Sequence, residues 1–221
     1  MPTELVLFDF DGTLADTLPA SFSAFKTVFK KYDDQDVTSD ELVAMFGPTE
    51  DEIILNNFSN KEAVRRAVQE YYEMYSQGHN QTIEINAIIV LLQFLKERGM
   101  KIGVITGKST RAYQISAEAL NLTSYFDYVV TGNDVVHPKP HPEGVLKAID
   151  YFGIKADKTV FLGDSNADIL AGKAAGVQTF AVQWLSTFQS SVFDVKPDRT
   201  FNSTSEFIQL IEEEHDKRRN G

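Results

Sequence analysis

The fold is decided by a stretch near the start of the chain, Leu5-Val6-Leu7-Phe8-Asp9-Phe10-Asp11-Gly12-Thr13. Its first four residues form an apolar run, which is typical of a parallel strand buried on both faces. Two aspartates and the turn pair Asp11-Gly12 follow this run directly. Because open parallel sheets bind ligands at the carboxyl ends of their strands, Asp9 and Asp11 are predicted to lie at a functional edge.

Four further apolar runs resemble the first, and segments with helical spacing lie between and after them. The predicted strands are 5–8, 102–106, 128–131, 160–163 and 179–182, and the predicted helices of this part are 87–98, 143–152, 166–175 and 205–214. Three of these helices are followed by glycine, which is typical of a helix C-terminus. The alternation predicts an α/β fold with a doubly wound, Rossmann-like parallel sheet.

The interval between the first and second predicted strands is much longer than one crossover connection needs. Apolar residues recur with helical spacing at 22–32 and 63–75, which predicts an inserted helical unit. Its borders are expected at 14–17 and at the polar stretch 77–82, where the chain could hinge. The predicted division is therefore a core domain of residues 1–14 and 83–221 and a helical cap domain of residues 15–82.

Composition excludes several classes of protein. The chain has 221 residues, 43% of them hydrophobic, a net charge of −11 and no cysteine. A negative field repels nucleic acid and anionic lipid, and the lack of cysteine excludes disulfides and thiolate metal sites. No apolar stretch approaches a membrane span of about 20 residues, and the N-terminus has no signal-peptide pattern. We expect a cytoplasmic protein with a small-molecule partner, either a monomer or a homodimer.

Polar residues also follow the other predicted strands. Thr106-Gly107-Lys108 follows the second, Asp164 and Asp168 follow the fourth, and Lys139 lies in a proline-rich loop before the fourth. Carboxylates that converge on one crevice repel each other unless a cation is present, and oxygen ligands favour magnesium. Lys139, the Thr106 hydroxyl and the Gly107 amide would suit a bound phosphate. A magnesium-assisted phosphoryl site is the hypothesis.

The ordered set of motifs resembles that of the haloacid dehalogenase-like hydrolases. It comprises Asp9-Phe10-Asp11-Gly12-Thr13-Leu14 with Asp16-Thr17, then Thr106, then Lys139-Pro140, then Gly163-Asp164 with Asp168. The resemblance implies a helical cap between the first and second motifs. It also implies a phosphatase that works through an aspartyl-phosphate intermediate. Gly107 departs from the family pattern, in which serine or asparagine is common at that position.

The resemblance also implies roles for individual residues. Asp9 would be the nucleophile, and Asp11 would protonate the leaving oxygen and later activate water. Magnesium would be held by Asp9, the backbone carbonyl of Asp11 and Asp164, while Thr106, Gly107 and Lys139 would bind phosphate. Asp168 would ligate the metal through water or orient Lys139.

The substrate stays open between related activities. Phosphoglycolate phosphatases are the nearest by resemblance, with pyrophosphatases of the same cap type close behind. A mutase similar to the β-phosphoglucomutases would use the same two aspartates, and no residue excludes it. A non-catalytic phosphate-sensing module is a further alternative, although the intact Asp9, Asp11, Lys139 and Asp164 argue against it.

Three other patterns receive simpler interpretations. Gly107-Lys108-Ser109 is similar to the end of a nucleotide P-loop, but that motif needs glycine where Ile102 stands, so Ser109 or Thr110 is predicted to be a helix N-cap. His137 and His141 lack a third soft ligand at useful spacing, which disfavours a metal site there. Tyr71, Tyr72 and Tyr75 are expected in the core of the cap.

Overall fold

A six-stranded sheet in which all strands are parallel organises the larger part of the molecule. The computed structural model describes residues 3–79 and 85–219. The strands are β1 (Leu5–Phe8), β2 (Lys101–Ile105), β3 (Tyr128–Val130), β4 (Thr159–Gly163), β5 (Gln178–Val182) and β6 (Arg199–Phe201), in the order β3-β2-β1-β4-β5-β6. In the register, Phe8 pairs with Val104 on one side and with Leu162 on the other, so β1 is central. The doubly wound α/β prediction is confirmed.

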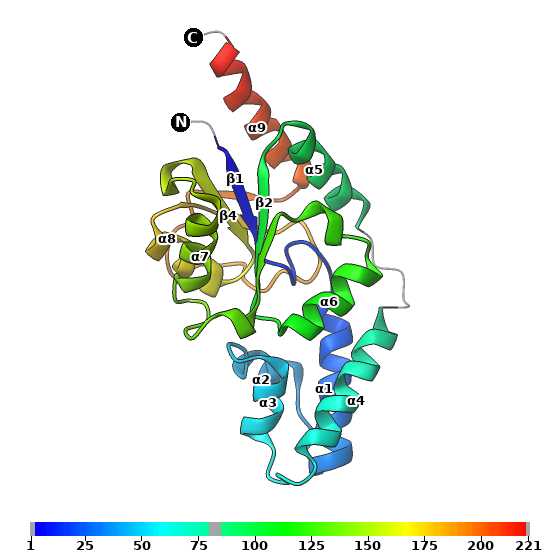
Figure 1. Cartoon of the computed structure of the whole chain (residues 1–221). Coiled ribbons are helices and arrows are strands. Elements are labelled where there is room, and N and C mark those ends of the chain that lie inside the picture. The colour runs from blue at the N-terminus through cyan, green and yellow to red at the C-terminus, as the bar shows by residue number, and fades with distance from the viewer. Residues whose placement is uncertain (1–2, 80–84, 220–221) are drawn as a thin grey trace.

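The alternation of side chains along β1 explains why its whole run is apolar. Val6 and Phe8 belong to one buried cluster, whereas Leu5 and Leu7 belong to another on the opposite face. Helices α5 (Asn86–Glu97), α6 (Thr110–Ala119) and α9 (Thr204–Arg219) supply side chains to the first cluster, and α7 (Glu143–Phe152) and α8 (Asn166–Ala175) to the second. Figure 1 shows these two groups on opposite sides of the sheet. A strand covered on both faces needs apolar residues at every position.

The helical insert has its own aromatic core. Its helices are α1 (Leu18–Asp33), α2 (Ser39–Ala44), α3 (Glu50–Asn57) and α4 (Val64–Gly78). Phe25 on α1 packs against Tyr71 on α4 with ring centroids 4.4 Å apart, and Tyr71, Tyr72 and Tyr75 are all buried. The prediction that these tyrosines form the core of the cap is confirmed. Figure 1 shows the insert beyond the carboxyl ends of the strands, next to α6.

Several short elements are not predicted by the sequence pattern. Strand β6 has three residues, and only Phe201 of them is buried, so it carries no apolar run. Helices α2 and α3 are also short, and each begins with a capping box, Thr38 with Glu41 and Thr49 with Glu52. At the C-terminus, α9 continues to Arg219, past the predicted end at residue 214.

The borders of the predicted domains remain predictions. Helix α4 continues to Gly78, so the first residues of the predicted stretch 77–82 are helical. Residues 80–82 of that stretch lie outside the described residues.

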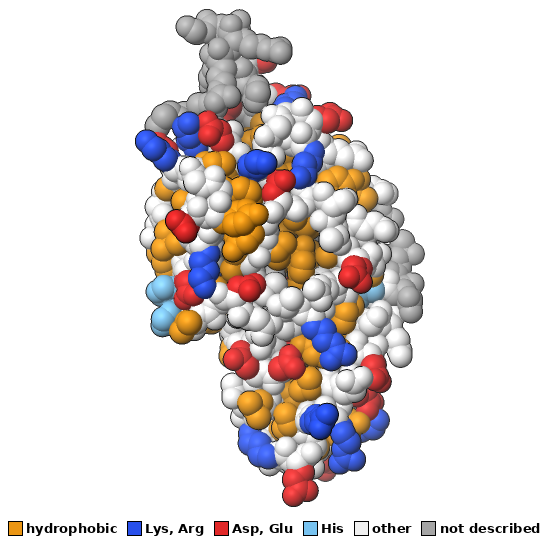
Figure 2. Space-filling view, in the orientation of Figure 1, with side chains coloured by type: hydrophobic (Ala, Val, Ile, Leu, Met, Phe, Trp, Pro, Cys, Tyr) orange, Lys and Arg blue, Asp and Glu red, His pale blue; other side chains and the backbone are white. Residues whose placement is uncertain are grey.

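On the surface, charged side chains of both signs gather at the far end of the cap, whereas hydrophobic side chains lie on the face of the core (Figure 2). Within residues 3–79 and 85–219, no helix has both the length and the apolar character that a membrane span requires.

Candidate active site

Asp9 lies at the carboxyl end of β1 and is almost fully buried, with 4% of its surface exposed. Its amide donates a hydrogen bond to the carbonyl of Leu162, which continues the β1–β4 pairing, and its Oδ1 accepts one of 2.6 Å from Lys139 Nζ. Among the described residues, none donates a hydrogen bond to Oδ2. Burial raises the pKa of Asp9 to about 7, although the charge of Lys139 opposes this shift. One carboxylate oxygen is thus fixed and the other is available.

Lys139 reaches this carboxylate from the loop before α7. Its Nζ donates to Asp9 Oδ1 and to Asp168 Oδ1, both at 2.6 Å, and to the carbonyl of Ile105 at 3.2 Å. All three ammonium hydrogens therefore have acceptors. Burial lowers the pKa of Lys139, but the carboxylates of Asp168 and Asp9 outweigh burial and raise it above its ordinary value. The lysine stays charged.

Asp164 is fully buried just after β4. Its Oδ1 accepts from the Thr13 hydroxyl at 3.2 Å and its Oδ2 from the Gln189 amide at 2.8 Å. Burial, together with the neighbouring charges of Asp168 and Asp9, raises the pKa of Asp164 to about 8. A Cβ added to Gly12, whose φ is +74°, would lie 2.3 Å from Asp164 Oδ2, so the turn after Asp11 requires glycine.

Asp168 is held through both of its carboxylate oxygens. Oδ2 accepts from the amide and hydroxyl of Ser165, which forms a capping box at the start of α8, and Oδ1 accepts from Lys139. This geometry favours the role of orienting Lys139 over that of a metal ligand. We call Asp9, Lys139, Asp164 and Asp168 the core cluster.

The donor set of the core cluster fits a hard divalent cation. Asp9, Asp164 and Asp168 can each offer one oxygen, and these oxygens lie within 4.8 Å of one another. Three buried carboxylates face one lysine, so negative charge is left uncompensated in a region of low dielectric. Oxygen ligands and excess negative charge are what magnesium and calcium prefer.

Asp11 turns away from the core cluster toward the cap. Its Oδ1 lies 3.1 Å from Lys108 Nζ and accepts a hydrogen bond from the Thr17 hydroxyl. Its side chain therefore lies outside the group of clustered carboxylates, and the role of its backbone carbonyl as a metal ligand stays a prediction. It remains close enough to line the same cavity as Asp9.

Sequence reasoning missed Lys108 as a site residue. Only 5% of it is exposed, and its Nζ contacts both Asp11 and the hydroxyl of Tyr75, which lies at 2.7 Å. Tyr75 belongs to the cap, and its ring lies 4.6 Å from the same Nζ. The sequence does carry a signal for this residue, because a lysine directly follows the polar end of β2. The sequence alone suggested only that this lysine could be part of a P-loop motif.

Glu50, the first residue of α3, also went unnoticed. It is buried, and its Oε2 accepts a hydrogen bond of 2.8 Å from the amide of Ser109, the residue after Lys108. Burial raises the pKa of Glu50, while Lys108 opposes that shift. Ser109 caps α6 as predicted, since its side chain accepts from the amide of Ala112. We call Asp11, Glu50, Tyr75 and Lys108 the interface cluster, because it joins cap and core.

Members of both clusters line one cavity of about 160 Å³ between the cap and the carboxyl edge of the sheet, namely Asp9 and Lys139 of the core cluster and Asp11, Glu50 and Lys108 of the interface cluster. The predicted phosphate-binding residues Thr106, Gly107 and Lys139 also line it. The Thr106 hydroxyl accepts from the amide of Lys108 at 3.2 Å, and a Cβ at Gly107 would meet nothing within 4 Å, so Gly107 borders open space. The structure thus brings all the sequence-predicted site residues to one place.

Comparison with known proteins decides the family. A family model described as "Haloacid dehalogenase-like hydrolase" matches residues 6–182, which is most of the chain. The chain belongs to this family. Pyrophosphatase PpaX of Bacillus mycoides is 30% identical over 214 residues, which cover 96% of this chain and 98% of that protein.

Solved structures share the fold of this chain. CbbY from Rhodobacter sphaeroides, in complex with phosphate, superposes with a TM-score of 0.80 at 22% identity and covers 93% of this chain and 96% of its own. A haloacid dehalogenase-superfamily hydrolase of subfamily IA from Geobacter sulfurreducens has a TM-score of 0.69 at 27% identity and covers 94% and 99%. The predicted family is confirmed, and so is the prediction of an enzyme of the phosphatase class.

Proposed function

We propose that this haloacid dehalogenase-like hydrolase removes a phosphoryl group from a small phosphorylated molecule by transferring it first to Asp9. The single observation that carries the proposal is the state of the Asp9 carboxylate. It is buried at the floor of a cavity, Lys139 holds its Oδ1, and its Oδ2 accepts no hydrogen bond from the described residues. A carboxylate fixed by one oxygen and open at the other is oriented for nucleophilic attack.

The proposed reaction has two balanced steps. Asp9 Oδ2 attacks phosphorus, the bond between phosphorus and the leaving oxygen breaks, and Asp11 gives that oxygen a proton. Asp11 then takes a proton from water, the water oxygen attacks the phosphorus of the aspartyl phosphate, and the bond to Asp9 breaks to release phosphate. General acid–base help of this kind contributes about 10²–10⁴ in rate.

A divalent cation, which we propose to be magnesium, would be held by Asp9 and Asp164 and by the backbone carbonyl of Asp11. It would supply charge neutralisation for the transferred phosphoryl group. Lys139 lowers the pKa of Asp9 against the effect of burial and adds positive charge beside the phosphoryl oxygens. Thr106 and Gly107 also line the cavity and offer a hydroxyl and a backbone amide that no side chain of its own residue shields.

Two kinds of substrate fit the cavity. A phosphate monoester with a small acidic leaving group, such as phosphoglycolate, suits the volume of about 160 Å³. Pyrophosphate is the second candidate, because a second buried lysine, Lys108, stands beside Asp11 where a leaving phosphate would depart. The PpaX relative carries the name of a pyrophosphatase, which supports the same candidate.

A cytoplasmic location and a monomeric or homodimeric state remain predictions.

The test is phosphate release from a panel of phosphoglycolate, pyrophosphate, sugar phosphates and nucleotides, each with magnesium and with a chelator. Wild type should release phosphate from at least one anionic compound only with the cation. Asp9→Asn should lose this activity by about 10⁴-fold or more, because it cannot form the intermediate. Asp150→Asn, the same change at an exposed position of α7, should behave as wild type.

Two results would redirect the proposal. Turnover by Asp9→Asn at the rate of Asp150→Asn would refute the nucleophile. If no compound of the panel releases phosphate, and a sugar phosphate is converted only when a sugar bisphosphate is added, the protein is a mutase instead.

A further inference from the structure

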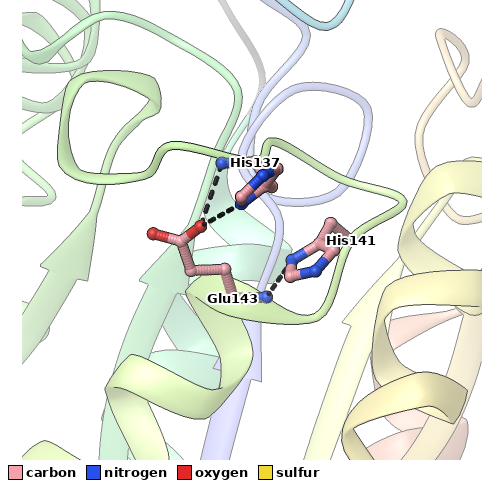
Figure 3. Close-up of side chains that lie close together, drawn as sticks. All are labelled: His137, His141 and Glu143. Atoms are coloured by element: carbon pink, nitrogen blue, oxygen red, sulfur yellow. Dashed lines mark hydrogen bonds and ion pairs between the residues drawn. The ribbon is translucent and has the colours of Figure 1, made fainter.

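A second cluster of metal-ligand side chains lies outside the active site, on the loop that carries Lys139. His137, His141 and Glu143 each offer one donor atom, and these atoms lie within 4.8 Å of one another. Figure 3 shows both imidazoles gathered over the start of α7 beside the Glu143 carboxylate. The ring centroids of the two histidines are 4.7 Å apart. Neither histidine contributes to the proposed phosphoryl transfer.

The Glu143 carboxylate is already fixed by its neighbours. Its Oε1 accepts from the amide of Val136 at 3.0 Å and contacts Lys147 Nζ at 2.9 Å, and its Oε2 accepts from the amide of His137 at 2.9 Å. Because Lys147 occupies the Oε1 side, Oε2 faces the imidazoles.

The spacing of the donors suits a small tetrahedral ion. His137 Nδ1 lies 3.2 Å from Glu143 Oε2, and two ligands of one tetrahedral zinc ion lie about 3.4 Å apart. His141 Nδ1 accepts a hydrogen bond of 3.2 Å from the Glu143 amide, which the exposed ring can give up by turning. Prolines at 138, 140 and 142 restrict the backbone between the donors, so little conformational freedom remains to be lost on binding.

We propose that His137, His141 and Glu143 form a binding site for a transition-metal dication such as zinc, nickel or copper, distinct from the carboxylate centre of the active site. Two imidazoles and one carboxylate are donors that select these ions over magnesium. A water molecule would complete four ligands, as in zinc sites with three protein donors.

The position of this site links it to the active site. Lys139 lies between the two histidines in the chain, and its side chain points inward to Asp9 and Asp168 while theirs stay exposed. A metal that joins residues 137, 141 and 143 closes a short ring of chain around Lys139. Bound metal therefore restrains the loop that places the lysine, and amide hydrogen exchange across residues 136–143 should slow.

The experiment separates the two metal sites with a pair of variants. Asp164→Asn weakens the carboxylate centre, and His137→Gln/His141→Gln is then added to it. Zinc binding is measured by competition with a chromophoric chelator, and hydrogen exchange of residues 136–143 is followed in parallel. Asp164→Asn should bind one zinc ion that magnesium does not displace, and the added histidine changes should weaken this binding by at least about 100-fold.

Two results would contradict the proposed transition-metal site. If Asp164→Asn binds no zinc, or if zinc binding is unchanged after both histidines are replaced, the proposal is wrong. Should Asp164→Asn not fold, the same comparison uses wild type, in which replacement of the two exposed histidines must reduce the number of bound zinc ions by one.

Discussion

The core cluster and the interface cluster both hold charged side chains in buried positions, but different parts of the molecule supply their members. In the core cluster, Lys139 on the loop before α7 joins Asp9 at the end of β1 and Asp168 in the first turn of α8. In the interface cluster, Lys108 joins Asp11 of the core to Tyr75 of the cap. The first is complete within the core, whereas the second exists only while the cap lies against the sheet.

This difference suggests a division of labour. The proposed nucleophile, Asp9, has the fixed geometry that a sheet edge provides. The proposed acid and base, Asp11, lies where cap and core meet, so its arrangement depends on closure of the cap. Each prediction below either breaks one cluster or sharpens the contrast between the two.

Breaking the core cluster should have the largest effect. Lys139→Met leaves the carboxylates of Asp9 and Asp168 buried without their cation, which should lower the free energy of unfolding by about 3–5 kcal/mol. Urea unfolding measures this change. Lys173→Met, which removes a surface pair with Asp198, should cost no more than about 1 kcal/mol. Equal losses in the two variants would show that the core cluster is no more tightly coupled than a surface pair.

Cation binding should stabilise the core cluster next most strongly. At about 100 times its dissociation constant, magnesium should add about 2.7 kcal/mol to the free energy of unfolding, and Asp164→Asn should lose most of this gain.

Without the cation, the free energy of unfolding should fall as the pH rises from about 4 to about 8. The reason is that the folded pKa values of Asp9, about 7, and Asp164, about 8, exceed the pKa of the same groups in the unfolded chain. Urea titrations at several pH values measure both effects, and stability that rises over this range would contradict the account.

Breaking the interface cluster should alter substrate preference. Lys108→Met removes the positive charge beside Asp11 and should lower kcat/KM for pyrophosphate by about tenfold, or about 1.4 kcal/mol, with a smaller effect on esters whose leaving group is neutral. Steady-state kinetics on both substrates measure the ratio. Lys155→Met, at an exposed lysine, serves as the control. An equal loss on both substrates would place Lys108 in general phosphate binding rather than in discrimination.

The smallest effect is expected from Tyr75→Phe. The hydroxyl accepts from Lys108 at 2.7 Å and lies 2.6 Å from the Ser116 hydroxyl, so its removal should cost about 1 kcal/mol in the free energy of unfolding. Tyr113→Phe is the matched control, because the Tyr113 side chain is largely buried and its hydroxyl makes no such pair among the described residues. A larger loss in the control would mean that the interface hydrogen bonds contribute nothing specific.

The sequence sufficed for the core cluster because each of its members follows a recognisable element. Asp9 and Asp164 end buried apolar strands, Lys139 stands among prolines, and Asp168 lies one helical turn beyond Asp164. Strand β6 and helices α2 and α3 were not predicted, because segments this short show no measurable periodicity of apolar residues.

The interface cluster could not be foreseen in the same way. Lys108, Glu50 and Tyr75 meet only because α4 and α3 of the insert pack against α6 and the end of β2. No local pattern encodes how two units dock. For the same reason the exposed group around His137 was judged without Glu143, whose carboxylate turns back to the loop from the first residue of α7.

The central claim is that Asp9 carries the phosphoryl group between the two steps. The most direct test is to quench the enzyme in acid during turnover of its best substrate and examine the peptide that contains Asp9 by mass spectrometry. The account predicts the mass of one phosphoryl group on Asp9, sensitive to hydroxylamine and absent when magnesium is chelated. Turnover without any phosphorylated Asp9, or with the group on another residue, would contradict it.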